Sequence, residues 1–130
     1  ARAQFDVVHP QFPNVRGVSI VQFAMPFAGS GQPTRNTCIV APGRSDRSPT
    51  GTGTSARMAV LQARGQMAQG DRLIHESIIG SLFKGCVEAA VTVANRPAII
   101  PSIAGWARMT GYNTIFIDDR DPFAHGFVVT

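Results

Sequence analysis

Residues 43–59 read Gly43-Arg44-Ser45-Asp46-Arg47-Ser48-Pro49-Thr50-Gly51-Thr52-Gly53-Thr54-Ser55-Ala56-Arg57-Met58-Ala59, and they predict a loop that opens a helix. The ring of Pro49 fixes its own φ and biases the preceding residue toward an extended backbone. The two glycines that follow let the main chain turn and let a ligand approach it closely. Helical periodicity then begins, with apolar residues at spacings of three and four: Ala56, Ala59, Val60, Ala63 and Met67. We expect the helix to run from about Gly53 to Arg64 and to stop at Gly65.

The start of such a helix is a natural place for an anion. Its first N–H groups lack partners within the helix, and the helix dipole adds positive charge, so a carboxylate or phosphate would bind there. Gly-x-Gly before a helix is a weak pattern by itself. The stretch lacks the third glycine of a dinucleotide site and the Gly-Lys-Ser/Thr ending of a P-loop. The alternative is a turn capped by Thr52 or Thr54 with no ligand.

The composition is that of one globular domain. The chain has 130 residues, of which 44% are hydrophobic and 15% charged, so it can build a core. No apolar run approaches the ~18 residues that cross a bilayer, and no signal peptide organisation is present at the N-terminus. The chain does not begin with Met, which suggests a piece of a longer protein. Few cysteines and no signal favour a reduced, cytoplasmic protein.

The charge pattern and the cysteines exclude several classes of site. The net charge is +4, but the basic residues are scattered singly, without an aromatic platform, which argues against nucleic acid. Cys38 and Cys86 are far apart and form no Cys-x-x-Cys pair, so no metal site is predicted. We expect both thiols to be buried and to act as small hydrophobic groups.

The remaining elements are predicted to be strands. Val15–Ala24 should be a strand buried on both faces, and Asn36–Ala41 a second strand that leads into the loop. Short runs split by Gly and Pro follow at Leu73–Ile79, Leu82–Ala94, Ala98–Ile103, Trp106–Tyr112 and Thr114–Asp118. The expected fold class is α+β, with a mostly antiparallel, curved sheet wrapped around a central helix.

The whole string Asp46–Ala59 resembles the second active-site motif of the proline racemase family. The resemblance continues at His75–Ser81, Ile100–Gly105, Asp121–Phe123 and Gly126–Phe127, and it covers the chain from about Val15 to its end. It implies one lobe, the C-terminal one, of a two-lobed fold like that of diaminopimelate epimerase. Residues 1–130 would then form this lobe, with the last strands (about 114–130) packing on the other lobe.

Thr50 departs from the pattern of the racemases. In that family a cysteine stands between the Pro and Gly of the motif and serves, with a second thiol from the other lobe, as an acid and base at Cα. A threonine hydroxyl does not ionise near neutral pH. The resemblance therefore favours a trans-3-hydroxy-L-proline dehydratase, a hydro-lyase that removes the Cα proton and eliminates the 3-hydroxyl as water to give pyrroline-2-carboxylate. In it Thr50 would hydrogen-bond the substrate hydroxyl.

Other roles are carried over from the family by position. Asp46 would pair with the ring nitrogen of the substrate, and the N–H groups of Gly51 and Thr52 would hold its carboxylate. We interpret His75 and Glu76 as strand residues, and the nearby arginines, including Arg57, as structural or solvated.

Two further functions stay open at this point. One is a proline or 4-hydroxyproline racemase or epimerase that tolerates Thr50, and the other is a non-catalytic module that binds a carboxylate or a partner. The family's first motif, with its proton-abstracting cysteine, is absent, so the 130 residues should be inactive alone. The expected partners are a hydroxyproline-type imino acid and the N-terminal lobe, without a cofactor, metal, nucleic acid or membrane. A homodimer also stays open.

Overall fold

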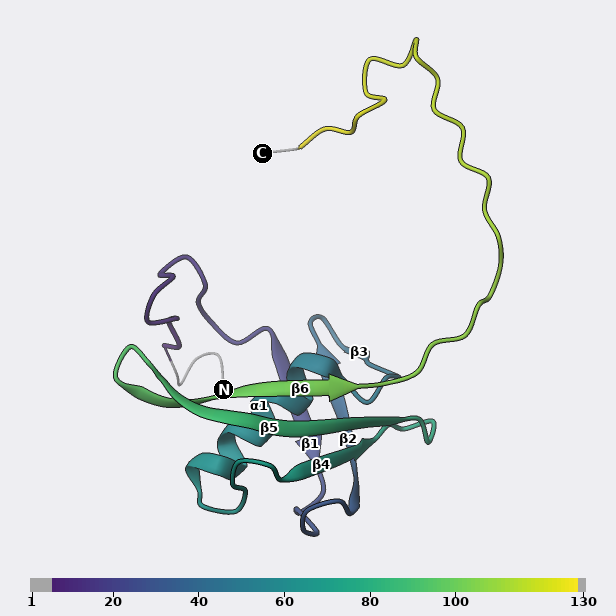
Figure 1. Ribbon diagram of the computed structural model, residues 1–130. Coiled ribbons are helices and arrows are strands. Elements are labelled where there is room, and N and C mark those ends of the chain that lie inside the picture. Colours follow the sequence, from purple (N-terminus) through teal and green to yellow (C-terminus); the bar gives the residue numbers. More distant parts are fainter. Residues whose placement is uncertain (1–5, 129–130) are drawn as a thin grey trace.

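A computed structural model describes residues 6–128. The elements occur in the order β1 (Ile20–Ala24), β2 (Pro33–Val40), β3 (Arg44–Ser45), α1 (Gly51–Ala63), β4 (Arg72–Glu76), β5 (Leu82–Val93) and β6 (Arg96–Ala104). Six strands form one sheet in the order β1-β2-β4-β5-β6, with β3 paired to β2 (Figure 1). All neighbouring strands are antiparallel except β2 and β4, which run parallel with Thr34 opposite His75.

The helix α1 packs against β4, β5 and β6 and forms the core with them (Figure 1). Its buried residues are Thr54, Met58 and Leu61, at the spacing that one helical face requires. They meet Leu73 of β4 and Val87 of β5, both fully buried. The α+β class, with a mostly antiparallel sheet on one helix, is therefore confirmed.

The helix begins two residues earlier than predicted, at Gly51, and ends at Ala63. Its stop is as expected: Gly65 has a φ of 69°, and its N–H donates to the carbonyl of Gln62 at 2.9 Å. The side chains of Thr52 and Thr54 do not cap the helix, because Thr54 instead donates back to the carbonyl of Thr50. The helix is also less enclosed than predicted, since Val60 on its outer side is 48% exposed.

Several strand predictions were wrong in extent or burial. The first strand starts at Ile20 instead of Val15 and is an edge strand, so Phe23 is 62% exposed instead of buried. The second strand begins earlier, at Pro33. Residues 106–112 and 114–118 form no strand, because they leave the sheet after β6 and meet no strand to pair with (Figure 1). The predictions for residues 129–130 lie outside the described residues.

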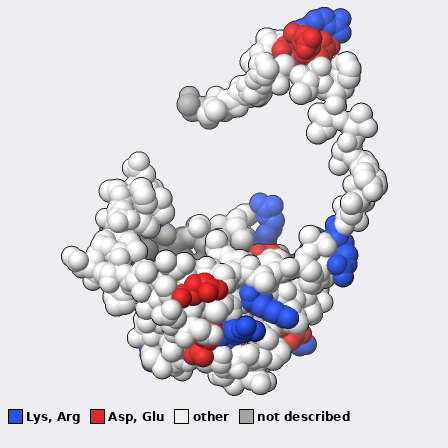
Figure 2. Space-filling model, in the orientation of Figure 1, with Lys and Arg blue, Asp and Glu red and all other residues white. Residues whose placement is uncertain are grey.

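The two cysteine side chains differ in burial. Cys38 on β2 is buried, as expected, whereas Cys86 on β5 is partly exposed, because its side chain points to the sheet face opposite α1. Across residues 6–128, three or more His, Cys, Asp or Glu side chains never gather in a metal-binding arrangement, and no helix is long and apolar enough to cross a bilayer. Charged side chains lie scattered over a mostly uncharged surface in Figure 2.

Candidate functional site

The loop between β3 and α1 carries the predicted site residues. It leaves the sheet at Asp46, whose N–H donates to the carbonyl of Cys38 at 2.8 Å. It enters the helix through Thr50, which is 4% exposed and has φ 66° and ψ 123°. Such a backbone conformation costs a β-branched residue roughly 1–3 kcal/mol, so the surrounding contacts must hold it.

The first N–H groups of α1 are available to a ligand. Within residues 6–128, the N–H groups of Gly51, Thr52 and Gly53 donate to no backbone acceptor, and no side chain caps this end of the helix. Gly51 and Thr52 are exposed. The helix start thus presents unpaired donors and the positive end of the dipole at the surface, which is the arrangement that binds a carboxylate.

Asp46 lies four residues before Thr50 and is partly exposed. Its Oδ1 accepts the N–H of Ser48 at 2.8 Å, which is an Asx turn within the loop. Thr50, Gly51 and Thr52 are contiguous at the helix start, so the structure brings these three together. Asp46 shares their loop, and its second carboxylate oxygen accepts no hydrogen bond from residues 6–128.

Asn36 on β2 fixes the loop from beneath. Its Nδ2 donates to the carbonyls of Pro49 at 3.2 Å and Glu76 at 3.4 Å. Its Oδ1 accepts Nε2 of Gln22 at 3.0 Å and the hydroxyl of Thr50 at 3.4 Å. Asn36 is 4% exposed, and every hydrogen-bonding position of its amide has a partner. Asn36 was not predicted from the sequence; the available signal was an amide side chain in a strand that also carries Thr37, Ile39 and Val40.

A second buried network reaches the same loop from β4. His75 is fully buried, with Nδ1 2.7 Å from the hydroxyl of Thr54 and Nε2 2.8 Å from Nη1 of Arg57. Thr54 in turn donates to the carbonyl of Thr50 at 2.6 Å. Burial, and secondarily the charge of Arg57, lowers the pKa of His75 to about 4, so its imidazole is neutral at pH 7.

Arg57 has a structural position, as the sequence analysis favoured. Its Nη1 donates to Thr34 on β2 at 3.3 Å as well as to His75, and its Nη2 donates to the carbonyl of Met25. The guanidinium therefore joins α1 to β2 and to the segment after β1. These bonds use three of the five N–H donors of the guanidinium.

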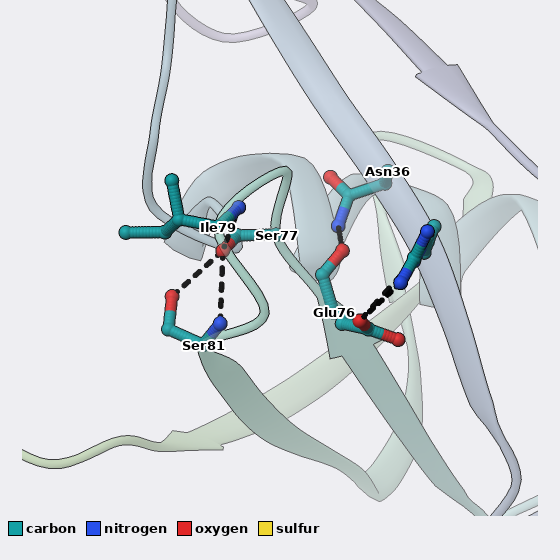
Figure 3. A network of polar contacts seen from close by, with 6 residues as sticks. Asn36, Glu76, Ser77, Ile79 and Ser81 are labelled. Carbon is teal, nitrogen blue, oxygen red and sulfur yellow. Dashed lines mark hydrogen bonds and ion pairs between the residues drawn. The ribbon is translucent and has the colours of Figure 1, made fainter.

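A wide hollow of about 1090 Å³ borders the loop at Arg47–Pro49. Its other walls are the turn after β4 and the end of β6, at residues 79–84 and 104–106. The hydroxyl of Ser77 shapes that turn: it accepts the N–H groups of Ile79 at 3.2 Å and Ser81 at 3.1 Å (Figure 3). In the same view Asn36 reaches the carbonyl of Glu76. The carboxylate of Glu76 also pairs with Nη2 of Arg35 at 3.0 Å. Asp46, Thr50, Gly51 and Thr52 do not line this hollow, which lies beside the loop.

Comparison with known proteins identifies relatives of this chain. Residues 1–128 match the family described as proline racemase. A probable 4-hydroxyproline 2-epimerase of Rhizobium meliloti is 60% identical over 98% of this chain, and a 4-hydroxyproline 2-epimerase of Paracoccus denitrificans is 58% identical over 97% of it. The chain spans 38% of the length of each relative.

Solved structures agree in fold. A hydroxyproline epimerase from Agrobacterium vitis, crystallised with trans-4-hydroxy-L-proline, has a TM-score of 0.78 and 40% identity. A probable proline racemase from Agrobacterium radiobacter, crystallised with carbonate, has a TM-score of 0.78 and 41% identity. Both matches cover 98% of this chain, and 36% and 37% of the other chain.

These relatives overturn the prediction of a dehydratase. The curated relatives at 58–60% identity are named epimerases, which are isomerases and not hydro-lyases. The argument from Thr50 to dehydration was therefore wrong. In the structure Thr50 is 4% exposed, and its hydroxyl donates to Oδ1 of Asn36 at 3.4 Å.

Proposed function

Because this chain belongs to the proline racemase family, we propose that it supplies the carboxylate-binding half of the active site in a 4-hydroxyproline epimerase. Such an enzyme inverts Cα by removing its proton and returning one on the opposite face. The observation that carries the proposal is the set of unpaired N–H groups at Gly51 and Thr52, at the exposed start of α1. The names of the similar proteins support the substrate class.

Carboxylate binding at this helix start would also help the chemistry. When the Cα proton leaves, negative charge spreads onto the adjacent carboxylate. Donors from Gly51 and Thr52, together with the helix dipole, stabilise that charge more in the transition state than in the ground state. Binding and acceleration would thus come from the same N–H groups.

Asp46 is proposed to pair with the ring nitrogen of the substrate. The imino acid carries a positively charged ammonium, which needs a counter-charge in a closed site. One carboxylate oxygen of Asp46 is engaged by the N–H of Ser48, which orients the group. The other oxygen is then the one that faces the ligand.

Thr50 is proposed to contact the substrate without transferring its proton. Its hydroxyl does not ionise near neutral pH and already donates to Asn36. We therefore propose that the group which removes the Cα proton lies beyond these 130 residues. A proton returned to Cα from the side of Thr50 would have to come from another group. We expect this step to be slower than in a racemase with a cysteine at this position.

We further propose that residues 1–130 form one lobe and that residues from about 114 onward pack on the other lobe. The support is the apolar surface of the segment after β6, which leaves the sheet (Figure 1). Its large hydrophobic side chains are more than half exposed at Trp106, Met109, Tyr112, Ile115, Phe116, Ile117, Phe123, Phe127 and Val128. An apolar surface of this extent is typical of a contact site.

The test uses the full-length protein that contains this sequence, in D2O, with trans-4-hydroxy-L-proline followed by proton NMR. Inversion at Cα with deuterium incorporation is the expected result. Loss of trans-3-hydroxy-L-proline, supplied in a parallel sample, would contradict the proposal. The 130-residue chain serves as a second sample, and turnover by it would contradict a catalytic group outside the chain.

A carboxylate-binding protein without catalysis is the second candidate. The observation that favours it is Thr50, which places a non-ionising hydroxyl where a racemase has a thiol. Tight binding of pyrrole-2-carboxylate, combined with no deuterium at Cα of any proline derivative, would support this candidate over the epimerase.

A further inference from the structure

The network that runs from Arg57 through His75 to the Thr50 carbonyl has a fixed direction. Arginine only donates hydrogen bonds, so Nε2 of His75 must accept the bond from Nη1 at 2.8 Å. In a neutral imidazole the proton then sits on Nδ1, which donates to the hydroxyl of Thr54 at 2.7 Å. The Thr54 hydroxyl in turn donates a hydrogen bond to the carbonyl of Thr50 at 2.6 Å.

The last bond of this network, to the carbonyl of Thr50, affects the orientation of the Gly51 N–H in the candidate site. The carbonyl of Thr50 and the N–H of Gly51 belong to one planar trans peptide, so they point in opposite directions. The carbonyl is held toward Thr54 by its hydroxyl at 2.6 Å and by its N–H at 3.3 Å, and this turns the N–H of Gly51 outward. Gly51 is exposed, and its N–H has no acceptor within residues 6–128.

The peptide needs such a restraint. Thr50 has φ 66°, a conformation that a threonine adopts only when its surroundings impose it. Asn36 holds the preceding carbonyl, of Pro49, and the Thr50 side chain. Thr54 holds the following carbonyl through its hydroxyl and its N–H, and His75 binds that hydroxyl. The strained residue is thus fixed on both sides by buried groups of the sheet and the helix.

We propose that His75 is a positioning residue, which acts through Thr54 to aim the N–H of Gly51 at the substrate carboxylate. The inference rests on the proposed carboxylate site and adds the residues that orient it. His75 touches no substrate in this arrangement. It works as a neutral group of one tautomer, with Arg57 deciding which ring nitrogen carries the proton.

Two substitutions at His75 test separately the hydrogen bond of its Nδ1 to Thr54 and that of its Nε2 to Arg57. His75→Asn places an amide N–H near the position of Nδ1 and keeps the bond to Thr54. His75→Gln places an amide oxygen near Nε2 and keeps the bond to Arg57 but loses the donor to Thr54. Thr54→Val removes the hydroxyl at almost constant shape. Val60→Ala, on the exposed side of the same helix, is the control.

The measurement is the affinity of the full-length protein for pyrrole-2-carboxylate by titration calorimetry, beside the thermal midpoint of each variant. We expect His75→Gln and Thr54→Val to bind about tenfold more weakly, as the loss of one oriented hydrogen bond predicts. His75→Asn should recover most of that loss. Equal affinity in all folded variants, or a loss that follows thermal stability instead of the Thr54 bond, would overturn the proposal.

The wild-type protein gives an independent answer if the variants do not fold. Nitrogen-15 NMR of labelled histidine should show His75 as the tautomer protonated at Nδ1, and the amide of Gly51 should shift on addition of pyrrole-2-carboxylate. A proton on Nε2, or a charged ring at pH 7, would overturn the positioning role. Absence of any binding by wild type would instead reject the carboxylate site itself, and binding without Cα exchange would reject only the epimerase.

Discussion

The side-chain amide of Asn36 lies 3.2 Å from the carbonyl oxygen of Pro49 and ties the site loop to the middle of the sheet. The same amide nitrogen reaches the carbonyl of Glu76 at the end of β4, 3.4 Å away. One buried side chain therefore joins β2, β4 and the loop that precedes α1. This buried anchor helps to hold the strained entry of the loop into the helix at Thr50.

Replacing Asn36 by Asp should destabilise the protein. The new carboxylate oxygen would face two carbonyl oxygens in a buried site, where an unpaired polar group costs about 1–3 kcal/mol or more. Urea unfolding at pH 7 measures the change, with exposed Asn14→Asp as a matched control for the charge. Equal midpoints for the two variants would show that the Asn36 bonds contribute little.

The two glycines of the motif should respond in opposite ways to alanine. A Cβ at Gly53 would lie 2.4 Å from the hydroxyl oxygen of Thr50 and 3.0 Å from the sulfur of Cys38. We expect Gly53→Ala to lose about 1–3 kcal/mol through this overpacking, despite its better helix propensity. At Gly51 a Cβ meets nothing within 4 Å, so Gly51→Ala should be neutral or slightly stabilising. Thermal unfolding of both variants checks the contrast, and similar losses would contradict it.

The loop was predictable, and the helix start was predictable to within two residues, because their causes are local. Pro49, Gly51 and Gly53 limit the backbone through their own covalent structure, and the spacing of the apolar residues marks the helix that follows. Gly65 ended the helix for the same kind of reason. Predictions of this type need only a few neighbouring residues.

The supports of the loop were not predictable in that way. His75 was interpreted as an ordinary strand residue, because its partners Thr54 and Arg57 lie on a helix that only the tertiary fold brings close. Asn36 was missed for the same reason. The failed strands after β6 have a related cause: strand-forming residues need a partner strand, and none lies beside them in residues 6–128.

Restoring a thiol at Thr50 should speed the proposed proton exchange. A thiol with an ordinary pKa of ~8.5, beside the positive end of α1, reaches the thiolate far more readily than a hydroxyl. We expect Thr50→Cys in the full-length protein to raise Cα deuterium exchange of trans-4-hydroxy-L-proline by about 10²-fold, the lower range for a placed acid or base. Thr50→Ser keeps a hydroxyl and is the control. A Thr50→Cys rate equal to wild type would mean that this position takes no part in proton transfer.

Acid should weaken the fold through His75. Its pKa falls from an ordinary 6.5 to about 4 in the folded state, because burial disfavours the charged ring and Arg57 repels it. Arg57 is the charged group that faces the ring; the strand neighbours Thr34 and Phe83 are uncharged.

Between pH 6.5 and about pH 4 the unfolded chain binds more protons at His75 than the folded chain does. The contribution of His75 to the free energy of unfolding is therefore fully present above about pH 6.5 and declines as the pH falls toward 4. The contribution of this one group is roughly 3 kcal/mol over the window. Urea unfolding of wild type and His75→Gln at pH 7.0, 5.5 and 4.5 measures it. Wild type should lose stability more steeply than the variant, whereas parallel curves would mean that His75 takes up its proton without opposing the fold.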